Sequence, residues 1–298
     1  MLDTTLIKEK KSTYIDHDRL FKMLIKSFFQ EFMEAFFPEE CAFINFSTVK
    51  FMEQEVITDI FKGEKRRIDI LAEVTMKFED KLILIHVEPQ SYYQEEFNER
   101  MFIYLSRLYE KYRIPILPIA VFSYNERKDI PQKFTINFPT SQILEFNYLQ
   151  LHLKKKNWRE FIKTDNPAVA ALLSNMGYTK EERIQVRLEF LRMISRMELD
   201  PARMELLYGF FETYLKLTRE EEVQVEKEIA KLPEEEADRI LELPNSYFER
   251  GIEKGMEKRG VELVKNMHKR GLSVEQIADY SGISLEKVKE IIKNSSQY

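Results

Sequence analysis

The chain has 298 residues, of which 44% are hydrophobic and 12% aromatic, and its formal net charge is −5. This length allows one large core or two modest domains, and the composition is that of a folded protein. A single cysteine excludes a disulfide framework and a cysteine-based zinc site. No apolar run reaches the roughly 18 residues of a membrane span, and the polar N-terminus lacks a signal-peptide core. We therefore expect a cytoplasmic protein that does not contact a membrane.

The predicted elements of the first half alternate between helix and strand. Apolar residues at helical spacing predict a first helix over 14–37, ended by Pro38. The remaining segments are a strand at 48–61, a hairpin of 67–74 and 82–90, a helix at 95–112, and strands at 116–124, 134–138 and 143–151. The order of helix, three strands, helix and strand predicts an α/β sandwich around a mixed sheet, with a meander followed by a crossover helix.

The second half is predicted to be helical, and the chain divides into three parts. Residues 1–157 form the α/β domain, 158–248 a helical region, and 249–298 a Gly/Glu/Lys linker helix with a tail. In the tail, a helix at 261–270, a capping box of Ser273 with Gln276, and a turn at Ser281 predict a three-helix unit like a helix-turn-helix. This unit either contacts DNA through lysines of its last helix or serves as a structural or self-associating tail.

Polar residues interrupt the two apolar strands of the predicted hairpin. If the hairpin folds about the Glu79–Asp80 bond, Asp69 lies opposite Gln90 and Leu71 lies opposite Glu88. Asp69, Glu88 and Gln90 then share one face, with the two carboxylates at diagonal positions roughly 7–8 Å apart. Carboxylates within apolar strands are costly unless something compensates them, and a divalent metal is a natural compensator.

Each of these residues also has a purely structural interpretation. Pro89 within a strand indicates an edge or a bulge. The basic run at 62–67 is either part of a groove for nucleic acid or a solvated turn, and the acidic net charge argues against binding of nucleic acid over the whole surface. The structural alternatives for the polar residues are an ion pair of Asp69 with Arg66 or Arg67, a contact of Glu88 with His86 or Arg100, and Gln90 as a plain strand-end residue.

The motifs, taken in order, resemble a known family. Segments 16–22, 69–72, 86–91, 100–104 and 118–123 are similar to the recombination-promoting nuclease (Rpn) and transposase-like family, within the PD-(D/E)XK nuclease superfamily. The resemblance covers residues 14–125 well, the tail loosely and the helical middle poorly. It implies a restriction-endonuclease-like core and a Mg²⁺-dependent, or Mn²⁺-dependent, DNA endonuclease linked to recombination or mobile elements.

The resemblance also implies roles for single residues. Asp69 and Glu88 would bind the metal, the carbonyl of Pro89 would add a ligand, and Asp18 would bind through water. Gln90 stands where the superfamily usually has lysine, and since an amide carries no charge it would orient water or phosphate by hydrogen bonding. The alternative is a catalytically weak or inactive relative that acts as a DNA-binding protein or as an oligomeric interaction protein, through its helical C-terminal region.

Overall fold

The computed structural model describes residues 17–52, 56–58, 65–124, 130–243, 261, 263–269, 272–281 and 283–295. Two compact units divide the chain, Met1–Lys231 and Leu232–Tyr298. The sheet and the helices that follow it, up to residue 231, thus belong to one unit. This division does not coincide with the three predicted parts, 1–157, 158–248 and 249–298.

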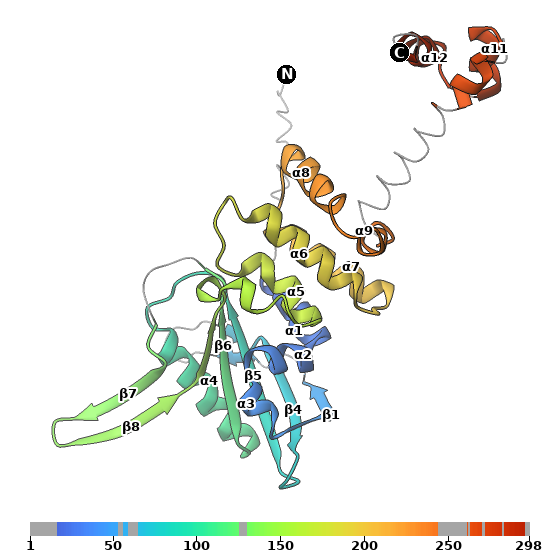
Figure 1. Cartoon of the computed structure of the whole chain (residues 1–298). Helices are drawn as coiled ribbons and strands as arrows, with labels where there is room; N and C mark the ends of the chain where they lie inside the picture. Colours follow the sequence, from blue (N-terminus) through green and yellow to red (C-terminus); the bar gives the residue numbers. More distant parts are fainter. Residues whose placement is uncertain are drawn as a thin grey trace, which may run out of the picture. The chain divides into compact units, whose positions relative to one another are not determined.

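A mixed five-stranded sheet forms the centre of the first unit, as predicted for an α/β protein (Figure 1). The strand order is β1-β4-β5-β6-β9. The first three strands are antiparallel neighbours, whereas β5, β6 and β9 run parallel. Their bounds are Ile44–Phe51 for β1, Ile70–Met76 for β4, Leu82–Gln90 for β5, Ile116–Phe122 for β6 and Leu149–His152 for β9.

The crossover between the parallel strands β5 and β6 is the helix α4, Phe97–Tyr112, close to the predicted 95–112. Its buried stripe includes Phe97, Met101 and Tyr104, at the spacing of one helical face. This stripe packs in one core cluster with Ala120 and Phe122 of β6. The helix therefore covers the sheet face to which these two strand residues point.

The predicted single helix over 14–37 is wrong in its continuity. The described part consists of α1, His17–Ser27, and α2, Phe29–Phe36, separated at Phe28, whose backbone angles of φ −129° and ψ 45° are not helical. Pro38 does not only end a helix, because it begins the short helix α3, Pro38–Cys41. The apolar spacing continues across Phe28, which is fully buried, so hydrophobic periodicity alone does not reveal the break.

Two predicted strands also have different bounds. The strand expected at 48–61 ends as β1 at Phe51, and Val56–Thr58 (β2) pairs with Lys65–Arg67 (β3) in a separate ribbon. The strand expected at 143–151 is divided into β8, Ser141–Asn147, and β9. Strand β8 pairs with β7, Lys133–Phe138, as a hairpin that extends away from the sheet (Figure 1).

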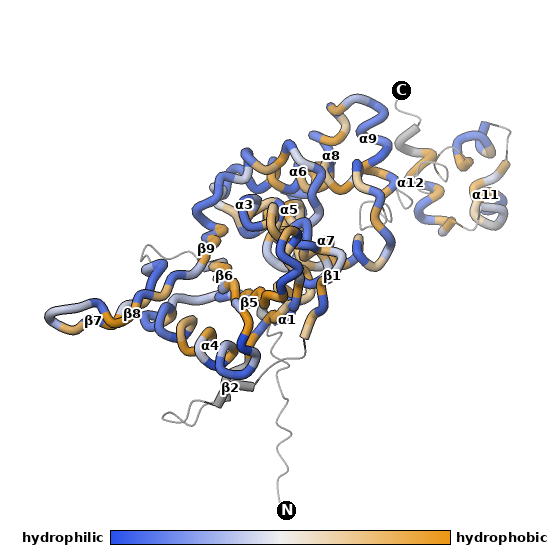
Figure 2. Tube along the Cα trace, turned by 90° about the horizontal axis from the view of Figure 1, so that it is seen from below, coloured by the Kyte–Doolittle hydropathy of each residue, from blue (hydrophilic) through white to orange (hydrophobic). Residues whose placement is uncertain are grey.

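The helices after the sheet pack against the N-terminal helices rather than forming a separate unit. Asn166 caps α5 and its Nδ2 donates to the carbonyl of Glu31 in α2, at 2.8 Å. Phe21 of α1 meets Phe210 of α7 edge to face, with ring centroids 5.0 Å apart. Figure 2 shows the central strands β5 and β6 as hydrophobic. The helices are α5, Pro167–Leu172; α6, Arg183–Ser195; α7, Pro201–Tyr214; and α8, Arg219–Ile229, with the 3-10 turns η1 (Leu153–Lys155), η2 (Trp158–Glu160) and η3 (Leu173–Asn175).

The second unit contains α9, Glu234–Leu241, and the predicted three-helix tail. Residues 261 and 263–269 are helical, and α11, Val274–Ser281, and α12, Leu285–Ser295, follow. The predicted capping box is present, because the Ser273 N–H donates to Oε1 of Gln276 at 3.0 Å and the Gln276 N–H donates to Oγ of Ser273 at 3.2 Å. The predicted glycine-spaced linker, as far as residue 260, lies outside the residues that the structure describes.

Apolar residues from all three helices of the tail form one small core. Val264, Ile277, Val288 and Ile291 are buried together. In the part of the chain that the structure describes, no helix has both the length and the apolar character to cross a lipid bilayer.

Candidate functional site

The pairing of β4 with β5 sets the positions of the predicted site residues. Ile70 pairs with Val87 and Thr75 with Leu82, so the hairpin is centred between Phe78 and Glu79. The predicted register, with Asp69 opposite Gln90, is therefore wrong by two residues. Because the error is an even number, Glu88 and Gln90 keep the face predicted for them, whereas Asp69 lies before the first paired residue of β4. Continuing the observed register by one residue puts Asp69, in the bend before β4, opposite Glu88.

Three polar residues of β5 lie on the sheet face that α4 covers. His86, Glu88 and Gln90 alternate along the strand, and Glu88 and Gln90 are in register with Ala120 and Phe122, which pack under α4. The His86 ring meets the ring of Tyr104 from α4, with centroids 5.6 Å apart. A polar stripe thus runs beneath the crossover helix.

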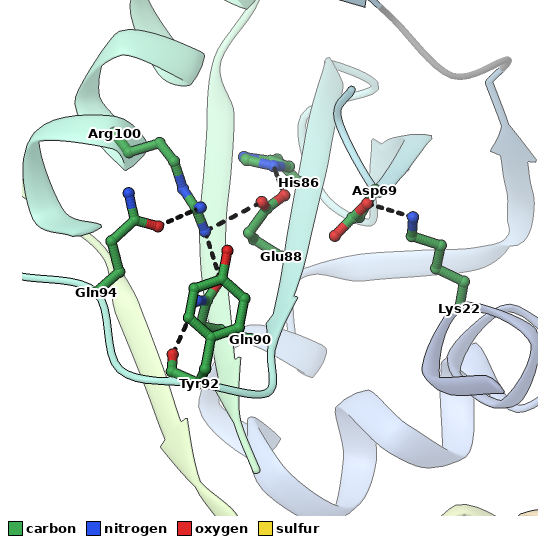
Figure 3. A network of polar contacts seen from close by, with 8 residues as sticks. All are labelled: Lys22, Asp69, His86, Glu88, Gln90, Tyr92, Gln94 and Arg100. Atoms are coloured by element: carbon green, nitrogen blue, oxygen red, sulfur yellow. Dashed lines mark hydrogen bonds and ion pairs between the residues drawn. The ribbon is translucent and has the colours of Figure 1, made fainter. Parts of the chain in front are cut away.

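Glu88 is 4% exposed and has a partner on each carboxylate oxygen (Figure 3). Nη2 of Arg100 lies 3.4 Å from Oε1, and Nε2 of His86 lies 3.3 Å from Oε2. Both structural alternatives considered for Glu88, His86 and Arg100, are therefore present at once. The helix that crosses the sheet supplies the cation that a buried carboxylate needs.

Arg100 is 9% exposed and is held from several sides. Its Nη2 donates to Oε1 of Gln90 at 2.6 Å and its Nη1 to Oε1 of Gln94 at 2.5 Å. The guanidinium carbon also lies 4.6 Å from the centroid of the Phe97 ring. These contacts fix the guanidinium beside Glu88.

Gln90 has protein partners at both ends of its amide. Oε1 accepts from Arg100, and Nε2 donates to the carbonyl of Tyr92 at 2.8 Å. The side chain is 4% exposed. In this arrangement Gln90 connects Arg100 to the segment that follows β5.

Asp69 forms an ion pair with Lys22 of α1, as the dashed line in Figure 3 indicates. The side chain of Asp69 is 12% exposed and that of Lys22 is 20% exposed. Lys22 was not among the residues that the sequence indicated for this site. The side chains of Arg66 and Arg67, considered as partners of Asp69, lie outside the described residues, as do those of the basic run 62–67.

Pro89 is the second-last residue of β5, and the backbone directions explain why a proline is tolerated there. The Ser123 N–H donates to the carbonyl of Gln90 at 3.0 Å, and the Leu84 N–H donates to that of Pro115 at 2.9 Å. Even-numbered residues of β5 therefore direct their backbone groups to β6 and odd-numbered ones to β4. Since β4 begins at Ile70, opposite Val87, a proline at 89 removes no ladder donor, and its carbonyl faces the side where Asp69 lies.

The chemistry of these residues fits a divalent metal. Asp69 and Glu88 offer carboxylate oxygens and Pro89 a carbonyl oxygen, and Mg²⁺ commonly uses only one or two carboxylates. The Glu88 carboxylate has about four acceptor positions, of which its contacts with Arg100 and His86 use two. Among the described side chains, no group of three or more His, Cys, Asp or Glu residues is placed to hold a metal ion. Asp18 lies in the first turn of α1, but its side chain is outside the described residues.

Comparison of the chain with protein-family models, with curated proteins and with solved structures finds no match. The resemblance to the Rpn family therefore rests on the sequence motifs quoted above.

Proposed function

We propose that this protein is a divalent-metal-dependent DNA endonuclease that hydrolyses phosphodiester bonds, with a role in recombination or mobile elements. The observation that carries the proposal is the register of the β4–β5 hairpin, in which Ile70 pairs with Val87, so that Asp69 and Glu88 occupy the next position of each segment. Both carboxylates are largely buried at the end of the hairpin away from its turn.

The arrangement of the sheet supports this proposal. Apart from the small β2–β3 ribbon after β1, the chain order is that of the restriction-endonuclease-like core that the PD-(D/E)XK resemblance implies. Three antiparallel strands, β1, β4 and β5, are followed by the crossover helix α4 and the parallel strand β6. The same order carries the motif segments that resemble the Rpn family. Motif and topology thus point to one reaction class, metal-assisted hydrolysis of a phosphodiester.

Asp69, Glu88 and the carbonyl of Pro89 would hold Mg²⁺ or Mn²⁺, and Asp18 would contribute through water. When bound, the metal supplies a water of lowered pKa and neutralises charge that develops on the phosphate. Arg100 and His86 hold the Glu88 carboxylate in one orientation, which preorganises the site. Gln90 keeps the guanidinium of Arg100 in place.

Nicking of a supercoiled plasmid tests the proposal. With Mg²⁺ or Mn²⁺, the wild-type protein is expected to nick the plasmid, and EDTA is expected to abolish the reaction. Asp69→Asn and Glu88→Gln are expected to lose activity because each removes a charged metal ligand. Glu73→Gln is the matched control, since Glu73 lies on the same hairpin but pairs with Leu84 nearer the turn. Equal nicking by all four proteins would identify a contaminating nuclease and overturn the proposal.

One observation favours the second candidate, an inactive relative that acts as a DNA-binding or oligomeric interaction protein. Each carboxylate already has a side-chain cation, Lys22 for Asp69 and Arg100 for Glu88, so charge balance does not require a metal. This candidate predicts DNA binding that is unchanged in Asp69→Asn and Glu88→Gln. Binding would instead be lost when the exposed lysines of α12, Lys287 and Lys289, are changed to glutamate in the full chain.

A further inference from the structure

We propose that Lys22 is a catalytic residue, whose ammonium exchanges the Asp69 carboxylate for a phosphate of the DNA substrate. The inference rests on the proposed function and adds a residue to its site. It follows from asking which positive charge of the site can reach a substrate phosphate, because phosphoryl transfer requires cations near the developing negative charge.

Residue 90 does not supply this charge. Gln90 is an uncharged amide, and it is engaged by Arg100 at one end and by the carbonyl of Tyr92 at the other. A phosphate contact by Gln90 would require breaking one of these two hydrogen bonds in a position that is 4% exposed. Among the side chains that the structure describes, the cations paired with the two site carboxylates are Arg100 and Lys22.

Arg100 is charged but is not available to a substrate. Its two terminal nitrogens already contact Glu88, Gln90 and Gln94, and its planar group lies against the Phe97 ring. Moving this guanidinium to a phosphate would leave a buried carboxylate without its main cation, which is costly. Arg100 thus serves to hold the site together.

Lys22 has the properties that Arg100 lacks. It is more exposed, at 20% of its side chain, and has a flexible stem with three donors on its ammonium. Its helix is fixed, because Phe21, Leu24 and Ile25 of α1 are buried. The ion pair with Asp69 therefore holds a mobile charge beside a proposed metal ligand, where an incoming phosphate can replace the carboxylate as its partner.

Binding of a short DNA duplex in EDTA tests the phosphate contact without catalysis. Each phosphate contact contributes about 0.9 to the slope of log K against log salt concentration, so Lys22→Gln is expected to lower the slope by about 0.9. Lys26→Gln is the matched control, since Lys26 lies one turn further along α1 and packs over the Phe51 ring. An unchanged slope for Lys22→Gln, or an equal loss for Lys26→Gln, would overturn the proposal.

Nicking with Mg²⁺ tests the catalytic part. Lys22→Gln is expected to lower kcat by about a hundredfold, the usual effect of removing one group that stabilises the transition state. Lys22→Arg, which keeps the charge, is expected to recover part of the activity and the full salt slope. If Lys22→Gln does not fold, Lys22→Met replaces it, since methionine also lacks the charge, and an unchanged salt slope in that variant overturns the proposal.

Failure of this inference differs from failure of the proposed function. If Asp69→Asn and Glu88→Gln are inactive while Lys22→Gln nicks DNA at the wild-type rate, only the role of Lys22 is wrong. If Asp69→Asn and Glu88→Gln nick as well as the wild type, the nuclease proposal itself is wrong. In that case the EDTA binding experiment still decides whether Lys22 contacts DNA.

Discussion

The two carboxylates of the candidate site are balanced by cations in different ways. Glu88 lies in a buried network in which Arg100 is bound on several sides, whereas Asp69 meets the long side chain of Lys22 nearer to solvent. The first arrangement fixes geometry, because none of its members moves without breaking buried contacts. The second leaves a cation that can change partner. Two helices thus supply cations of different kinds to the carboxylates of one hairpin, one fixed and one exchangeable.

The largest expected effect comes from removing Arg100 from the buried network around Glu88. Arg100→Ala is expected to lower the free energy of unfolding by about 3–5 kcal/mol, because it removes the guanidinium from a buried carboxylate. Arg107→Ala is the control on the same helix, since Arg107 forms an exposed pair with Glu110, which is worth at most about 1 kcal/mol. Urea denaturation measures both values, and equal losses would show that the Glu88 network adds no stability.

The sequence predicted the face that Glu88 and Gln90 share on β5, but not the register of the hairpin. Parity depends only on alternation along the strands, so it tolerates an error of two residues. The polar pair Glu79–Asp80 predicts the turn at that bond, whereas the observed turn includes Phe78, and Asp80 follows it with a left-handed φ of 47°. Asp and Asn adopt this conformation more readily than most residues, but the sequence does not say at which turn position it is needed.

Lys22 could not be found by the same reasoning. It lies on a helix that is separated from Asp69 by two further helices and three strands. Although Lys22 ends the motif segment 16–22, its apolar neighbours on α1 indicate only a buried face. A contact between elements this far apart depends on tertiary packing, which hydrophobic periodicity does not specify. Arg100 was accessible as a candidate because helix α4 directly follows β5 and returns over it.

Gln90→Lys adds a second cation to the buried network of Glu88 and Arg100. The substitution introduces the residue type usual in the nuclease superfamily that the motifs resemble, but it replaces the acceptor of Arg100 with a like charge. We expect a loss of about 2 kcal/mol in the free energy of unfolding and no gain in nicking activity. The same change at the exposed Gln142 of β8 is expected to cost less than about 0.5 kcal/mol. A more active Gln90→Lys variant would instead show that position 90 faces the substrate.

Lys22→Gln is expected to lower the free energy of unfolding by less than Arg100→Ala or Gln90→Lys does. The pair with Asp69 is partly exposed, so its loss should lower the free energy of unfolding by about 1 kcal/mol or less. Urea denaturation of Lys22→Gln beside Arg100→Ala makes this comparison directly. A loss as large as that of Arg100→Ala would mean that Lys22 is a structural cation like Arg100 and not an exchangeable one.

The smallest expected effect concerns salt, and it separates the two ion pairs most cleanly. Double-mutant cycles for Lys22 with Asp69 and for Arg100 with Glu88 give one coupling energy each. Between about 0.1 M and about 1 M salt the screening length falls from about 10 Å to about 3 Å, but buried pairs are screened much less. The Lys22–Asp69 coupling should therefore fall by a few tenths of a kcal/mol, whereas the Arg100–Glu88 coupling should stay constant. If both couplings fell alike, the buried network would be open to solvent, and it could not hold Glu88 rigidly for a metal.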